Sequence, residues 1–223
     1  MKYLTGIFAL LAVLAAIGPA QAVAEVTNQP FIDPLFADHM VLQRGISDPV
    51  WGWSTPGDVV TVSINGFMVK ARANSSGEWV ANLPSMSAGG PYSLKASGRQ
   101  TVTFQDVLVG DVWLCSGQSN MEFGIGNGLN ADAEIAAADY PSIRLFTVPK
   151  QTSISPLPST GGQWQVCTPT AIRQQGTWGG FSAVGYFFGR DLYEKLNIPI
   201  GLIQSSWGGD VGGGVDEPKD ASC

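Results

Sequence analysis

Ser119 lies in a sequence context that could support nucleophilic chemistry. It belongs to the run Gly117-Gln118-Ser119-Asn120, which follows the apolar stretch Val107–Cys115. A serine on a tight turn after a buried strand has its hydroxyl raised above the sheet, and neighbouring backbone N–H groups point to one place beside it. The pattern alone is weak, because a serine after a strand more often forms a turn or a helix cap. The run also lacks the last glycine of the lipase elbow Gly-x-Ser-x-Gly.

A second polar turn, Gln204-Ser205-Ser206-Trp207-Gly208-Gly209, follows the apolar run Ile200–Ile203. Open parallel sheets bind ligands at the carboxyl ends of their strands, so both turns are expected at one edge of the sheet. Glycine suits an oxyanion-binding position, because it lets the backbone approach a substrate closely. The alternative interpretation is that the two glycines form only a flexible turn.

Other residue types limit the chemistry that the chain can perform. His39 is the only histidine, and it lies 80 residues before Ser119 in a segment that we interpret as structural. One histidine and scattered cysteines exclude an ordinary zinc site, and no phosphate-binding Gly-x-x-x-x-Gly-Lys loop is present, so we predict no metal and no cofactor. Three tryptophans could stack on sugar faces, although roles in the core or in loops fit them equally well. They are Trp164, Trp178 and Trp207.

The first half of the sequence predicts antiparallel strands. Val60, Val62 and Ile64 alternate on one face, and the following Asn65-Gly66 is a strong hairpin signal. Further alternating runs continue to Phe104, and residues 31–53 are expected to add the first strands. We therefore predict an Ig-like β-sandwich over residues 25–105.

After residue 106 the pattern changes to that of a parallel sheet. The stretch Val107–Cys115 is expected to be a strand buried on both faces. The other expected elements are strands at 143–148 and 200–203, helices at 131–138 and 181–196, and a long loop at 149–180. The alternation of strands and helices predicts an α/β region over residues 106–209.

The first residues indicate an exported protein. Residues 1–22 have the charged start, apolar run and small-residue site of a signal peptide, so we expect export to the periplasm or the extracellular space and no membrane association after cleavage. Residues 210–223 have no apolar period and are expected to be disordered.

A net charge of −6 without any basic cluster disfavours nucleic-acid binding. Three cysteines are too few for a disulfide framework, and Cys115 is most simply a buried apolar residue.

Several segments resemble the sialate O-acetylesterase family, a branch of the SGNH (GDSL-like) hydrolases. The run Asp111–Glu122, which contains Ser119, is similar to the first conserved block of that family. Further segments match in the family's order: 35–44, 51–57, 181–190 and 201–209. The resemblance covers residues 34–209 and implies that 106–209 form the N-terminal part of a flavodoxin-like SGNH hydrolase domain.

The resemblance also implies a reaction and its residues. Ser119 would be the nucleophile that removes O-acetyl groups from sugars through an acyl-enzyme, and its own N–H with that of Gly208 or Gly209 would form the oxyanion hole. The substrate would be an acetylated glycan, either sialate or a plant polysaccharide such as xylan.

The family's remaining catalytic residues are absent. Its oxyanion asparagine lies in a Gln-Gly-Glu-type segment and its catalytic Asp and His in an Asp-x-x-His segment, and this sequence contains neither. We therefore expect a truncated and nearly inactive member. One alternative is a non-catalytic carbohydrate-binding protein that retains a hydrolase remnant. Another is that the product does not fold, because half a parallel sheet leaves an open apolar edge.

Overall fold

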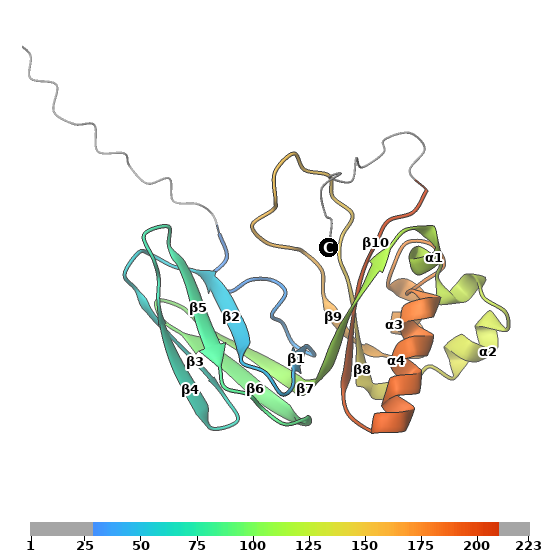
Figure 1. The fold of residues 1–223 in the computed structure, drawn as a ribbon, viewed down its shortest axis with the longest axis horizontal. Helices are drawn as coiled ribbons and strands as arrows, with labels where there is room; N and C mark the ends of the chain where they lie inside the picture. Colours follow the sequence, from blue (N-terminus) through green and yellow to red (C-terminus); the bar gives the residue numbers. More distant parts are fainter. Residues whose placement is uncertain (1–28, 210–223) are drawn as a thin grey trace, which may run out of the picture.

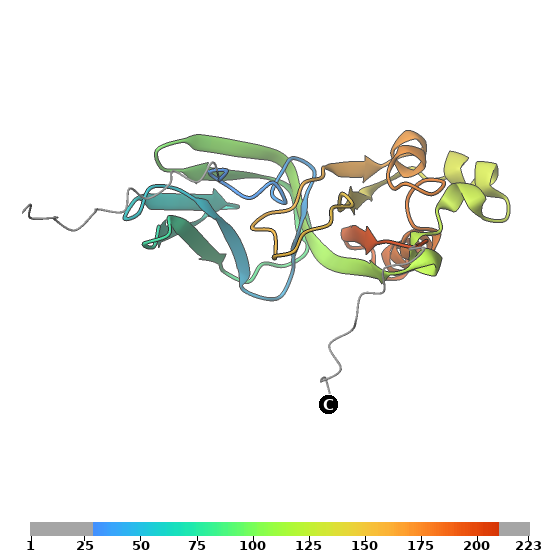
Figure 2. The same cartoon turned by 90° about the horizontal axis from the view of Figure 1, so that it is seen from above.

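Strand β7 (Thr101–Gly117) runs through both halves of the protein, and the other elements are arranged along it (Figures 1 and 2). The structure is a computed structural model that describes residues 29–209. The first half of β7 lies in a β-sandwich and its second half in an α/β region. The predicted signal peptide, 1–22, and the predicted tail, 210–223, lie outside the described residues.

Two sheets form the sandwich. In the larger sheet, the order is β4 (Phe67–Arg72), β3 (Val59–Ile64), β6 (Gly89–Ser97) and β7, and β1 (Val41–Gln43) pairs with β7 in parallel. The smaller sheet pairs β2 (Asp48–Trp53) with β5 (Glu78–Leu83). Side chains from both sheets meet in one core, to which Trp79 of β5 and Leu94 of β6 belong.

The hairpin predicted from residues 60–66 is confirmed. Val60, Val62 and Ile64 of β3 are buried in the core, each at most 2% exposed. Asn65 and Gly66 have φ angles of 48° and 78°, and a type I′ hairpin turn requires positive φ at both of its central residues. The sequence pattern was informative here because both signals are local.

The α/β region contains a mostly parallel sheet. Its strand order is β7, β10 (Ile200–Ser206), β8 (Tyr140–Thr147) and β9 (Trp164–Cys167). Strand β10 is parallel to both β7 and β8, which confirms the parallel sheet for these three strands. Strand β9 is antiparallel to β8. It and helix α3 (Pro169–Gln174) lie in the segment 149–180, so the prediction of an uninterrupted loop is wrong there.

Strand β7 is less covered than the sequence indicated. The predicted burial on both faces is correct from Val107 to Gly110, but Trp113 and Leu114 are 42% and 66% exposed. Beyond Gly110, β7 pairs only with β10 among the described residues. The open apolar edge that the sequence predicted is therefore present in this part of the chain.

Along the chain, helices connect the strands of the α/β region. Three short elements lead from β7 to β8: α1 (Ser119–Glu122), the 3₁₀ turn η1 (Ile125–Asn127) and α2 (Ala131–Ala136). Helix α4 (Ala183–Leu196) begins after Ser182, whose hydroxyl accepts the Gly185 N–H at 3.1 Å, a typical N-cap. It packs closely on β10, because a Cβ at Gly189 would lie 2.7 Å from Leu202. No helix among residues 29–209 is long and apolar enough to cross a membrane.

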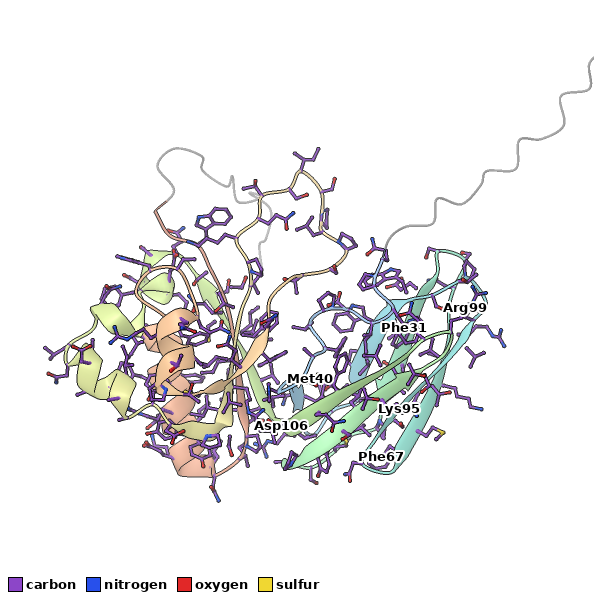
Figure 3. The ribbon with its side chains drawn as sticks, turned by 180° about the vertical axis from the view of Figure 1, so that it is seen from behind. Phe31, Met40, Phe67, Lys95, Arg99 and Asp106 are labelled. Carbon is purple, nitrogen blue, oxygen red and sulfur yellow. The ribbon has the colours of Figure 1, made fainter. Side chains whose placement is uncertain are left out.

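A buried arginine joins the sandwich to the α/β region. Arg144 of β8 is 4% exposed and donates two hydrogen bonds to the carboxylate of Asp106 in β7, at 2.8 and 3.1 Å. It also donates to the backbone carbonyls of His39 and Asp106, both at 3.2 Å. Asp106 in turn bonds His39 Nδ1 at 2.7 Å. Figure 3 shows Asp106 and Met40 where the two regions meet.

This junction should contribute to acid sensitivity. Burial raises the pKa of Asp106, but hydrogen bonds from Arg144 and His39 outweigh this and lower its pKa overall. A carboxyl group with a lowered folded pKa adds stability above its unfolded pKa of about 3.9, and that stability is lost as pH falls through the folded pKa. We expect Asp106→Asn to lower the urea midpoint clearly at pH 7 and much less at pH 3. Equal losses at the two pH values would contradict this role of the ion pair.

The two described cysteines should be unreactive in the folded protein. Cys115 and Cys167 are buried and form no disulfide, which confirms the buried position predicted for Cys115, and Cys223 lies outside the described residues. Burial raises the pKa of Cys115 to about 11 and that of Cys167 to about 12. The thiolate is the reactive form, so in a Cys223→Ser variant we expect no reaction with Ellman's reagent at pH 8 until denaturant is added. Rapid reaction of the native variant would show that the thiols are accessible.

Candidate active site

Ser119 lies where β7 ends and helix α1 begins. Gly117 is the last residue of β7, and its φ of 145° lies in the region that favours glycine. The chain thus turns sharply out of the strand, and Ser119 becomes the first residue of α1 and is exposed. Because the first N–H groups of a helix have no acceptor within it, donors are available at this turn. The strand-turn context that the sequence predicted for Ser119 is present.

The end of β10 lies directly against the Ser119 turn. Strands β7 and β10 are in register as parallel partners, with Ser206 beside Gly117. The Trp207 N–H continues this pairing by donating to the Gly117 carbonyl at 3.1 Å. A Cβ at Gly208 would lie 2.5 Å from Ser119 Cα. The position requires glycine because backbone, which cannot move aside cheaply, fills the space.

Gly209 requires glycine for a different reason. Its φ is 78°, and no atom lies within 4 Å of the place where its Cβ would stand. Space is therefore available, but the left-handed conformation disfavours other residues. Gly208 is limited by contact and Gly209 by conformation.

Glu122, the last residue of α1, is a buried carboxylate for which the sequence pattern predicted no role of its own. Its side chain is only 4% exposed. Its Oε1 accepts hydrogen bonds from the Lys150 ammonium group and, at 2.6 Å, from the Thr177 hydroxyl. Its Oε2 accepts the backbone N–H of Gly208 at 2.5 Å. Glu122 therefore connects α1 with the segments between β8 and β9, between α3 and α4, and after β10.

These contacts keep Glu122 charged. Burial raises its pKa, but the hydrogen bonds from Lys150, Thr177 and the Gly208 N–H outweigh burial, so that the pKa is lowered overall. The carboxylate is therefore ionised at neutral pH. Its presence three residues after Ser119 was visible in the sequence, but its three partners come from distant segments that no local pattern could indicate.

His39 lies beside the central part of β7, far from the end of the strand that carries Ser119. Its ring is bonded to Asp106, and the extended strand advances by roughly 35 Å from Asp106 to Gly117 at about 3.3 Å per residue. A general base must come within hydrogen-bond reach of the serine hydroxyl. His39 therefore cannot serve Ser119 in this arrangement, and the chain contains no other histidine.

The three tryptophans have different environments. Trp164 is buried, donates its indole N–H to the Leu35 carbonyl at 2.8 Å and packs against Phe146, so it is a core residue. Trp178 and Trp207 are each 47% exposed. The Trp178 carbonyl accepts the N–H of Gly124, just after α1, and Lys150 lies 5.5 Å from the Trp207 ring centre. Sugar stacking therefore stays a hypothesis for these two rings.

No group of three or more His, Cys, Asp or Glu side chains within residues 29–209 could hold a metal ion. Around Ser119 the described residues bring together a serine hydroxyl, backbone N–H groups, and the carboxylate of Glu122 with its ammonium partner.

Comparison with known proteins finds relatives among the sialate O-acetylesterases. No protein-family model matches the chain. It is 39% identical over 189 residues to the sialate O-acetylesterases of Mus musculus and Rattus norvegicus, and 38% identical to that of Homo sapiens. These matches cover 76–77% of this chain and 34–35% of the relatives. The chain thus spans about a third of the length of the curated relatives that it matches.

A solved structure gives the same result for the fold. The crystal structure of a carbohydrate acetylesterase from Xanthomonas citri matches with a TM-score of 0.74 and 40% sequence identity. The match covers 81% of this chain and 40% of the other.

Proposed function

This chain is a homologue of the sialate O-acetylesterases, and on that basis we propose that it carries the nucleophile of a carbohydrate O-acetylesterase. The observation that supports the proposal most is the position of Ser119 at the carboxyl end of β7, with the backbone of Gly208 packed against it. Open parallel sheets bind their ligands at this edge. We also propose that the sandwich is Ig-like and that the α/β region is part of a flavodoxin-like SGNH domain.

In the proposed reaction, the Ser119 hydroxyl attacks the acetyl carbonyl carbon of a sugar ester. A base takes the hydroxyl proton and returns it to the sugar oxygen as the carbon–oxygen ester bond breaks, which leaves an acetylated Ser119. Water then releases acetate and restores the serine. Backbone N–H groups beside Ser119 stabilise the negative charge on the tetrahedral oxygen in both steps.

No histidine of this sequence can be the base, because its only one, His39, is bonded to Asp106, which lies roughly 35 Å along β7 from the Ser119 turn. In serine hydrolases the loss of the base or its partners costs about 10⁴–10⁶ in rate. We therefore propose that the chain alone is nearly inactive.

We also propose, from residues 1–22, that the protein is exported and that its mature form begins near Val23.

A chimera tests this function. Residues 29–209 would replace the matched part of the Xanthomonas citri carbohydrate acetylesterase, whose remaining part would supply what this chain lacks. We expect the chimera to release acetate from O-acetylated sugars at least about 10⁴ times faster than the 223-residue chain. Acetylated xylan and O-acetylated sialic acid, compared side by side, would identify the substrate class. A chimera that unfolds cooperatively but releases no acetate would contradict the proposal.

A carbohydrate-binding role without catalysis is the second candidate. A hollow of about 400 Å³ lies between the sandwich and the loop 148–161, and Trp51, Leu157 and Asp33 are among its lining residues. An aromatic ring with a nearby carboxylate can hold a sugar. Tight binding of an unacetylated glycan by a Ser119→Ala chain would favour this role, whereas preference for the acetylated glycan would favour the esterase.

A further inference from the structure

Glu122 and Ser119 hold the same glycine from two sides. The Glu122 carboxylate accepts the Gly208 N–H at 2.5 Å, while the Gly208 α-carbon faces the backbone of Ser119 so closely that no Cβ would fit. Because Glu122 and Ser119 are the two ends of the four-residue helix α1, these contacts couple the orientation of Gly208 to that of the serine.

Lys150 balances the negative charge of the Glu122 carboxylate. An uncompensated negative charge beside Ser119 would oppose the formation of an oxyanion there. Lys150 and Thr177 both donate to Oε1, which leaves Oε2 for the glycine. The ammonium group of Lys150 thus balances the charge while the carboxylate holds the backbone.

Because Glu122 accepts the Gly208 N–H, that group is not available to an oxyanion, and the Gly209 N–H is the other candidate donor. The Gly208 N–H is occupied, whereas the Gly209 N–H has no hydrogen-bond partner among residues 29–209. Gly209 is exposed, and its φ of 78° turns the chain directly after Gly208.

We propose that Glu122 is a positioning residue that fixes Gly208 through its N–H, so that Gly209, and not Gly208, is the second oxyanion donor beside Ser119. This inference rests on the proposed esterase function for its meaning. The bond itself can be tested without any catalytic activity.

Amide hydrogen exchange in the full chain, followed by NMR with ¹⁵N-glycine, tests the arrangement directly. A hydrogen bond to a charged acceptor is stronger than one between neutral groups, so the Gly208 amide should exchange at least about tenfold more slowly than that of Gly209. Its proton should also resonate downfield, because a short bond to a carboxylate deshields it. If Gly209 were the better protected of the two, the assignment of donors would be overturned, and this comparison needs no variant.

Glu122→Gln then tests the cause. The amide is nearly isosteric, but it removes the charge, so we expect the Gly208 proton to shift upfield and to exchange about tenfold faster. The Gly189 amide in α4 serves as an internal reference and should not change. Glu194→Gln, on the exposed surface of α4, is the matched control. A Gly208 signal that responds equally to both variants would reduce Glu122 to a general structural role.

Discussion

Ser119→Ala is expected to lower the kcat of the chimera on an acetylated sugar by about 10⁴–10⁶, while KM changes little. The reason is that the variant removes the atom that forms the acyl-enzyme, whereas the backbone N–H groups and the sugar contacts remain. The measurement is steady-state acetate release, with thermal unfolding to verify that the variant folds.

Ser116→Ala is the matched control for this prediction. Ser116 is also exposed near the end of β7, and it is paired with Ser205 through the backbone. Its hydroxyl has no place in the proposed reaction, so its loss should change kcat by less than about threefold. Equal losses in both variants would show that the end of β7, and not the Ser119 hydroxyl, matters.

Arg144→Met is expected to lower the free energy of unfolding by about 3 kcal/mol. The substitution leaves the Asp106 carboxylate without its two hydrogen bonds from the guanidinium group, and it also leaves the His39 carbonyl without a donor. We expect a loss of unfolding free energy at the lower end of the range for broken buried ion pairs, because Asp106 is 33% exposed and keeps its bond to His39. Urea unfolding at pH 7 would measure it.

Arg173→Met provides the comparison. Arg173 pairs with Asp132 at 2.7 Å, close to the 2.8 Å between Arg144 and Asp106, but its two side chains are 58% and 95% exposed. Exposed pairs contribute about 0–1 kcal/mol, so this variant should be close to the unmodified protein. If Arg144→Met were no more destabilising than Arg173→Met, the two regions would not depend on the buried arginine.

Local signals allowed the strands of the sandwich and the ends of the long helix to be predicted. The alternation of Val60, Val62 and Ile64 and the positive-φ pair Asn65-Gly66 depend only on neighbouring residues. Helix α4 ends where expected, because Asn197 adopts a left-handed conformation with φ of 50°. These features need no knowledge of the rest of the fold.

Features that depend on distant partners were missed. Strand β9 has four residues and exists because it pairs with β8, while Trp164 and Cys167 at its ends are buried. So short a run has no recognisable period. The exposure of Leu114 was missed for the converse reason, since an apolar strand was assumed to be covered on both sides.

The candidate site was predicted in part. That the turns containing Ser119 and Gly208 meet followed from the rule that parallel strands end at one edge, and the structure confirms their contact. The acceptor for the Gly208 N–H could not be predicted, because Glu122 reaches it only after β7 and β10 are paired. The sugar-stacking hypothesis is wrong for Trp164, whose indole belongs to the core.

Covalent labelling of the chimera with a fluorophosphonate, followed by peptide mass spectrometry, would test directly whether Ser119 is the nucleophile. Such probes react with an activated serine nucleophile. We predict a single adduct on the peptide that contains Ser119, and loss of that adduct in Ser119→Ala. An active chimera whose adduct lies on a different residue, or that persists in Ser119→Ala, would contradict the assignment of Ser119 as the nucleophile.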